Sequence, residues 1–402
     1  MSTRTDDQPT TSEPSPSTPK TRRVRRLRRA LVITAAVLVV LFIALTFGVG
    51  WFFSSVALDV VDDPPATVAV KAVVAGDAIE LARSPQPENA GLHAVRHPDG
   101  YGIMSEQVAI SSDAVVRAWR DVEGTLSGSE VAGVVDSDVY QGDPSAVGLD
   151  HTDITVTSDI GDLPTWLVPT AADAPAAAAD TWIVFAHGRG GSVEEALRYL
   201  PMWHDLGHPV LVPAYRNDPG APADPRGWYG LGETEWRDID AAVTYALDNG
   251  AQDVVLAGWS MGGAIAMQLL DRSEHADAIS GLVLDAPVLD WRDTFDYQGS
   301  TFGLPSYQTA LAVRLVEARA GIDFDDYDWV RRADDVPDLP IYLVHSADDT
   351  YVPNDPSIAF AAARPDIVTF EQPSGADHTR EWNVDPEGYE AAMTAWFDAE
   401  ID

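Results

Sequence analysis

The stretch DVVLAGWSMGGA, residues 253–264, places a serine between an apolar run and a series of small residues. The run before it is typical of a buried strand, and MGGAIAMQLLDR after it is typical of a helix. Gly258, Ser260 and Gly262 form the pattern G-x-S-x-G, which in this context is a nucleophile elbow, a sharp turn that exposes the serine oxygen. The stretch therefore predicts Ser260 as a nucleophile and the backbone N–H of Met261 as a donor to an oxyanion.

Strands and helices alternate on both sides of this stretch. The expected strands are continuously apolar and lie at 153–158, 164–170, 181–188, 208–215, 253–258, 281–288, 340–346 and 367–372. Helices are expected at 192–207, 233–250, 261–272, 357–363 and 387–400. Continuously apolar strands are typical of a mostly parallel sheet whose two faces are both covered by helices, so the fold class is α/β.

A serine hydroxyl is a weak nucleophile and needs a base. After an elbow of this kind the acid and then the histidine follow along the chain. Three histidines follow Ser260, and His378, on a loop after the last strand, is the predicted base. His275 lies at the end of the helix after the elbow, and His345 lies within a strand.

The acid has three candidates in the sequence. Asp348 and Asp349 end the strand at 340–346, and Asp285 ends the strand at 281–288. Such an acid would orient His378 and stabilise its charged form.

A second oxyanion donor is expected from the glycine-rich loop HGRGG, residues 187–191, because glycines let the backbone approach a substrate closely. We predict the backbone N–H of Arg189 for this role. The Arg189 side chain would either meet a carboxylate or phosphate of the substrate or remain in solvent.

The N-terminal residues predict a membrane anchor. Residues 1–29 are expected to form a disordered, basic cytoplasmic tail, and residues 30–53 are 24 residues without a charge, long enough to span a bilayer. Basic residues before the span predict a cytoplasmic N-terminus, with the rest of the chain on the outside. A cleaved signal peptide is the alternative, since Ser55-Val56-Ala57 has the small-x-small pattern of a cleavage site.

Four regions are expected: the tail 1–29, a transmembrane helix 30–54, an extension of unknown role 55–150, and a main domain 151–402. The extension contains short strand-like runs at 67–74 and 78–82. The formal net charge of −37 disfavours nucleic acid as a partner. The absence of cysteine excludes thiol chemistry, and the sequence points to no cofactor or metal.

The motifs HGRGG, GWSMGG, HSADDTYVP and GADH together resemble the α/β-hydrolase superfamily over residues 151–402. YRND (215–218) and GLGETEW (230–236) are similar to membrane-anchored bacterial members and to the catalytic domains of prolyl-oligopeptidase-type peptidases. The resemblance favours Asp349 over Asp348 by its spacing to the following VP, and it implies acyl transfer to water.

The segment 291–336 interrupts the alternation and is expected to form a short cap over the site. It is rich in aromatic residues, which favours an apolar acyl pocket. The expected function is hydrolysis of an acyl ester on a small-molecule or lipid-like substrate. A serine peptidase and a non-catalytic binding protein of the cell envelope are the alternatives.

Overall fold

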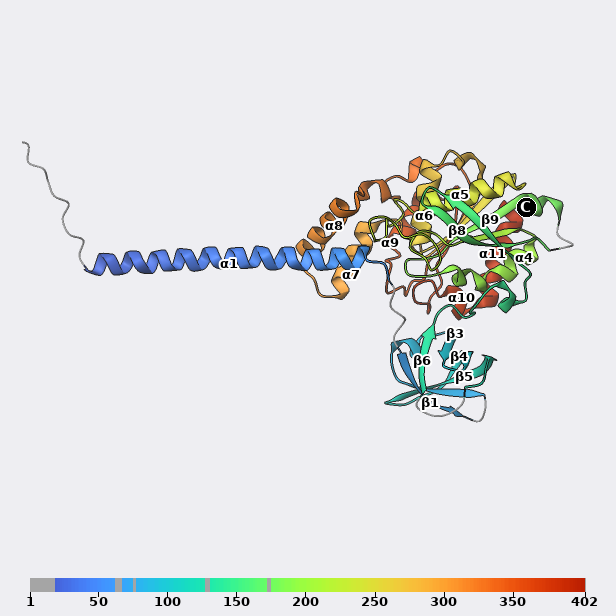
Figure 1. Ribbon diagram of the computed structural model, residues 1–402, viewed down its shortest axis with the longest axis horizontal. Coiled ribbons are helices and arrows are strands. Elements are labelled where there is room, and N and C mark those ends of the chain that lie inside the picture. Colours follow the sequence, from blue (N-terminus) through green and yellow to red (C-terminus); the bar gives the residue numbers. More distant parts are fainter. Residues whose placement is uncertain (1–18, 62–66, 75–76, 127–130, 172–174, 402) are drawn as a thin grey trace, which may run out of the picture.

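The computed structural model describes residues 19–61, 67–74, 77–126, 131–171 and 175–401. A long helix projects from a main α/β body, and a small β-barrel lies beside that body (Figure 1). The predicted tail up to residue 18 lies outside the described residues.

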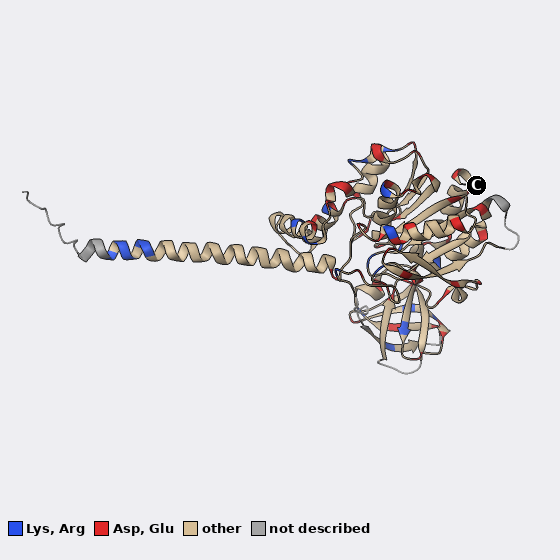
Figure 2. Ribbon diagram, turned by 45° about the horizontal axis from the view of Figure 1, so that its top comes forward, with Lys and Arg blue, Asp and Glu red and all other residues tan. Residues whose placement is uncertain are grey.

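Helix α1 runs from Pro19 to Leu58. The prediction of disorder is wrong for residues 19–29, which continue the apolar helix as its first turns. Arginine and lysine are good helix formers, and no glycine or proline separates them from the apolar run. Arginines mark the early turns of α1 in blue, and the helix from residue 30 on carries no charged residue (Figure 2). Residues 23–58 form a helix long and apolar enough to cross a membrane, a property that signal sequences share.

The region after α1 folds into a closed barrel with strand order β1-β2-β5-β4-β3-β6, all neighbours being antiparallel. The two strand-like runs predicted here are both observed. The strands are β1 (Thr67–Val74), β2 (Ala78–Ala82), β3 (His93–His97), β4 (Gly100–Ile110), β5 (Ala114–Glu123) and β6 (Val131–Asp136). Short helices α2 (Pro85–Glu88) and η1 (Pro144–Val147) flank them.

The main body is built on an eight-stranded sheet with the order β14-β13-β12-β11-β9-β10-β8-β7. Neighbours from β14 to β10 are parallel, and β8 and β7 add antiparallel strands at one edge. The strands are β7 (Thr152–Ser158), β8 (Gly161–Val168), β9 (Thr181–Ala186), β10 (Val210–Pro213), β11 (Asp253–Trp259), β12 (Ile279–Asp285), β13 (Ile341–Val344) and β14 (Val368–Glu371).

Both faces of the sheet are buried, as the apolar strands require. Successive residues of β9 alternate between two apolar clusters, one on each face of the sheet. On one face, Val184 packs with residues of α5 (Trp236–Asp248) and α6 (Met261–Arg272). On the other face, Phe185 packs with residues of α4 (Leu200–Leu206) and α11 (Pro386–Glu400). The remaining elements are α3 (Ala176–Asp180), η2 (Val193–Arg198), η3 (Ala276–Ala278), α9 (Asp355–Ala363) and α10 (Glu381–Val384).

One expected helix is divided. Residues 192–207 form the 3-10 turn η2 and then α4, because Pro201 in the first turn of α4 has no N–H to continue the hydrogen bonding from η2.

The segment predicted as a cap contains α7 (Trp291–Thr301), α8 (Ser306–Ala320), η4 (Phe324–Tyr327) and η5 (Ala333–Asp335). Helix α8 lies beside the C-terminal half of α1 (Figure 1). The end of α1 also enters the main body, where Leu58 is fully buried and its carbonyl accepts from the N–H of Tyr229 at 2.8 Å.

Candidate active site

The turn that carries Ser260 depends on glycine at three neighbouring positions. Ser260 lies between β11 and α6 with a φ of 55°, in the left-handed region that L-residues rarely adopt. A Cβ at Gly258 or Gly262 would overlap backbone atoms, and one at Gly263 would lie 2.5 Å from the Cβ of Pro287. The tight packing holds Ser260 in this strained conformation, and strain of this kind is concentrated at functional sites.

The structure brings the three predicted side chains into one hydrogen-bonded series. The Nε2 atom of His378 lies 2.8 Å from the Oγ of Ser260, and its Nδ1 atom lies 2.7 Å from Oδ2 of Asp349. Ser260 follows β11, Asp349 follows β13, and His378 follows β14, so all three lie at the carboxyl ends of parallel strands.

The carboxylate of Asp349 is buried and strongly bound. Its Oδ1 accepts from the N–H groups of Tyr351 and Val352 at 2.7 and 2.9 Å. Burial alone would raise its pKa, but the charges and hydrogen bonds of His378 and His345 outweigh burial and hold the pKa well below its ordinary value. Asp349 is therefore a carboxylate at neutral pH.

The imidazole of His378 has 17% of its side chain exposed. Burial would lower its pKa, but the charge of Asp349 and the hydrogen bond to it prevail, so the pKa is raised above the ordinary value of 6.5. An imidazole in this position can accept the Ser260 proton from Nε2 while Asp349 holds the proton on Nδ1.

The side chains of the other two candidate acids and of His275 lie elsewhere. Asp348 is exposed, and its Oδ2 accepts from the N–H of Gly375. Asp285 is fully buried and accepts a hydrogen bond from the Tyr389 hydroxyl at 2.9 Å. His275 follows helix α6, at the start of η3 and away from the carboxyl ends of the strands.

A second histidine, which the sequence did not suggest for the site, also contacts the acid. His345 is fully buried, with Nε2 at 3.1 Å from Oδ2 of Asp349 and Nδ1 at 2.8 Å from the Oγ of Ser357. The only signal for His345 in the sequence is its position four residues before the candidate acid. His345 and His378 thus both contact Oδ2 of Asp349, and His345 helps to fix the position of the carboxylate.

The loop 187–191 approaches the serine closely. A Cβ at Gly188 would lie 3.2 Å from the Cβ of Ser260, and the Gly188 N–H donates to Oε2 of Glu195 at 2.9 Å. The start of the loop is fixed by His187, whose Nε2 lies 2.8 Å from Oδ2 of Asp218. Asp218 belongs to YRND, so this motif supports the loop instead of contacting Ser260.

The structure gives the Arg189 side chain a partner that neither expectation included. Its guanidinium donates to the carbonyls of Val56 and Asp59 at 2.8 and 2.9 Å and lies 5.1 Å from the centre of the Tyr229 ring. The last carbonyls of a helix have no partner within the helix and attract a cation. The arginine therefore binds the end of α1.

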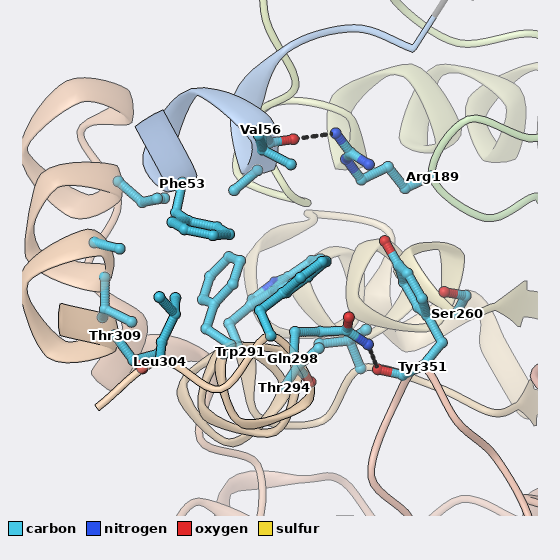
Figure 3. Close-up of a pocket in the computed structure, with 18 residues that line it drawn as sticks. Phe53, Val56, Arg189, Ser260, Trp291, Thr294, Gln298, Leu304, Thr309 and Tyr351 are labelled. Carbon is cyan, nitrogen blue, oxygen red and sulfur yellow. Dashed lines mark hydrogen bonds between the residues drawn. The ribbon is translucent and has the colours of Figure 1, made fainter. Parts of the chain in front are cut away.

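An apolar cavity extends from Ser260 to the C-terminal end of α1 (Figure 3). It encloses roughly 1000 Å³ of empty space, part of which is open to solvent. Side chains from α7 and α8 form one wall, and Phe53, Val56 and Ala57 of α1 form another. Among the described residues that line it, Arg189 alone is charged, and its guanidinium is turned onto α1.

No group of three His, Asp or Glu side chains suited to a metal ion occurs within the described ranges. The site as it stands offers a serine, a base and an apolar cavity.

Comparison with known proteins establishes the family. The alpha/beta hydrolase family model matches residues 183–401, more than half of the sequence, and the chain belongs to this family. Two crystal forms of an esterase from Pyrococcus furiosus have TM-scores of 0.51 and 0.50 at 18% and 19% identity, covering 66% and 65% of this chain and 96% and 95% of theirs.

A serine hydrolase without lid from Xanthomonas campestris has a TM-score of 0.45 at 14% identity, covering 62% of this chain and 94% of its own. At these identities the likeness to the esterase structures shows a shared fold. No curated protein sequence matches the chain.

Proposed function

We propose that this alpha/beta hydrolase is a membrane-anchored serine hydrolase that cleaves acyl esters. The observation that carries the proposal is the hydrogen-bonded series of Ser260, His378 and Asp349 at the end of an apolar cavity. A strained serine next to a histidine that is held by a carboxylate is the arrangement that activates a hydroxyl for attack on a carbonyl carbon.

In the first half of the reaction, Ser260 Oγ attacks the acyl carbon and His378 Nε2 takes its proton. Met261 is the first residue of α6, so its N–H has no partner within the helix and can donate to the oxyanion. The N–H of Arg189 is the proposed second donor. His378 then gives its proton to the alcohol that leaves, and Ser260 keeps the acyl group.

In the second half, His378 takes a proton from a water molecule that attacks the acyl-serine. The acid is released, and His378 returns the proton to Ser260. Asp349 keeps the imidazole oriented in both halves and stabilises its positive charge without taking the proton.

The anchor is the uncharged segment 30–53, preceded by a basic cluster. We propose that it crosses the membrane with its N-terminus in the cytoplasm, so that the hydrolase domain lies outside. Membership of the membrane-anchored group related to prolyl-oligopeptidase-type peptidases remains a proposal, supported by the YRND and GLGETEW motifs.

The test is labelling of the full-length chain, in detergent or nanodiscs, with a fluorophosphonate probe. The wild type should be labelled, and Ser260→Ala should lose all labelling. Ser300→Ala removes an exposed serine near the cavity and is the matched control, which should be labelled like the wild type. Hydrolysis of esters and peptide amides then separates an esterase from a peptidase. A folded wild type that is neither labelled nor active would contradict the proposal and favour a binding role.

A further inference from the structure

The end of the hairpin formed by α7 and α8 carries no charge, which is unusual in an acidic chain. The 17 residues 297–313, YQGSTFGLPSYQTALAV, contain no Asp, Glu, Lys or Arg, although 22% of the whole chain is charged. Within them the side chains of Phe302 and Tyr307 are 66% and 50% exposed. The hairpin of α7 and α8 therefore ends in a tip, residues 301–307, that is uncharged and presents two aromatic side chains.

This tip and α8 lie along α1. The ring of Tyr307 is 6.4 Å from that of Phe42, and a Cβ at Gly50 would meet the side chain of Leu311. Further along, the guanidinium of Arg319 lies 4.3 Å from the ring centre of Trp51. From its first turn to its last, α8 thus follows α1 in the same direction, with its first turn farthest from the main body (Figure 1).

The position of the basic cluster fixes the depth of the tip. About 20 helical residues cross a hydrocarbon core of roughly 30 Å, so a core that begins after Arg29 ends near Gly50. Phe42 precedes Gly50 by eight residues, which places it about 12 Å inside the core at 1.5 Å per residue. Tyr307 contacts Phe42, and charged side chains return only at Arg314, where α8 approaches the level of the interface.

The cavity reaches the surface near the end of this core, beside Phe53, which follows Gly50 by three residues. Phe302 lines the cavity and is exposed, and its ring lies 5.6 Å from that of Phe53, another lining residue. Phe53 and Ser260 line the same cavity (Figure 3), and most of the side chains that line it with them are apolar.

We propose that the tip of the α7–α8 hairpin inserts into the membrane leaflet beside α1, and that the cavity takes the acyl chain of an ester lipid directly from that leaflet. The chain enters between Phe53 and Phe302, and its ester carbonyl reaches Ser260. The part of this proposal that concerns turnover rests on the proposed hydrolase function. Insertion of the tip rests only on the proposed membrane anchor.

Insertion can be measured without turnover, from a spin label at a single introduced cysteine. The label goes to one position because the chain has no cysteine of its own. The full-length Tyr307→Cys variant, labelled with a nitroxide and reconstituted in liposomes of phosphatidylethanolamine and phosphatidylglycerol, should be relaxed more by oxygen than by a water-soluble nickel complex. Val108→Cys, at a 61% exposed position of the barrel, should show the reverse. Equal access of the nickel complex to both labels would overturn the proposal.

Lipid entry is measured with two substrates. A long-chain ester lipid embedded in the liposomes and a short, water-soluble ester are offered to the full-length chain. Tyr307 does not line the cavity, so Tyr307→Asp should reduce hydrolysis of the lipid at least about tenfold, because an aspartate in the hydrocarbon core is costly. Its hydrolysis of the soluble ester should stay within about twofold of the wild type, and Val108→Asp should change neither.

The outcomes separate the two proposals. A wild type that cleaves the soluble ester but not the lipid, or a Tyr307→Asp variant with unchanged lipid hydrolysis, would overturn the inference and leave the proposed function intact. A wild type that cleaves neither ester and escapes the fluorophosphonate would instead contradict the proposed function, and the nitroxide would still report on insertion.

Discussion

Replacing Asp349 by asparagine keeps the size of the side chain and removes its charge. The Oδ1 position accepts from two backbone N–H groups, so the amide oxygen of the asparagine must take that position. The amide NH₂ then faces Nδ1 of His378 and donates to it. The proton of His378 moves to Nε2, where it faces Ser260, and the histidine can no longer accept the serine proton.

A histidine held in the wrong tautomer lowers kcat by about 10⁴ in the serine hydrolase mechanism, which is about 5.4 kcal/mol in the barrier. The pH profile gives a second signature. Asp349 raises the pKa of His378 against the opposing effect of burial, so activity of the wild type should fall as pH drops through a value above 6.5. Without the carboxylate the pKa falls, and the acid limb of the residual activity should move to lower pH.

The assay is kcat and KM on a soluble short-chain ester between pH 5 and 9, with thermal unfolding to verify the fold. Asp348→Asn is the matched control, since Asp348 is exposed and contacts the N–H of Gly375 instead of His378. The control should keep its rate within about twofold. If Asp349→Asn lost less than tenfold, or if Asp348→Asn lost more, the reasoning from the hydrogen-bond geometry would be refuted.

Two further predictions concern stability. Gly262→Ala should destabilise the chain by about 3 kcal/mol in chemical unfolding, because the new Cβ overlaps the carbonyl oxygen of Ala186 at the end of β9. The control Gly48→Ala adds a Cβ that meets nothing within 4 Å and should be nearly neutral. Equal unfolding midpoints for the two variants would count against this prediction. Arg319→Ala removes two hydrogen bonds to α1 and the stacking on Trp51, and should cost about 1–3 kcal/mol in nanodiscs. Arg314→Ala, on an exposed side chain of the same helix, should cost little; a similar loss in both variants would argue against the contact with α1.

The sequence was most informative where local constraints are strong. The turn around Ser260 needs small residues at fixed offsets, and the order of serine, acid and histidine left few choices for the base. The apolar strands and the helices between them predicted the sheet, because burial on two faces leaves a continuous apolar run. The preference for Asp349 over Asp348 came from the family resemblance, and the geometry agrees with it in placing Asp349, and not Asp348, beside His378.

The parts that could not be predicted depend on contacts between distant residues. Arg189 binds carbonyls that lie 130 or more positions earlier in the chain, and no local pattern encodes such a pairing. The barrel was hard to recognise for another reason: register shifts in the β1–β2 and β4–β5 pairs break the strict alternation by which strands are read.

The end of α1 forms a wall of the cavity as well as the last turn of the proposed anchor, so release of the domain from the membrane would alter the cavity. Cleavage after Ala57, the position that resembles a signal peptidase site, would remove Phe53 and Val56 from the cavity and separate Arg189 from the carbonyl of Val56. A shed form would therefore keep Ser260 but hold its acyl chain in an open groove. Removal from the membrane and loss of activity on long acyl chains would be a single event.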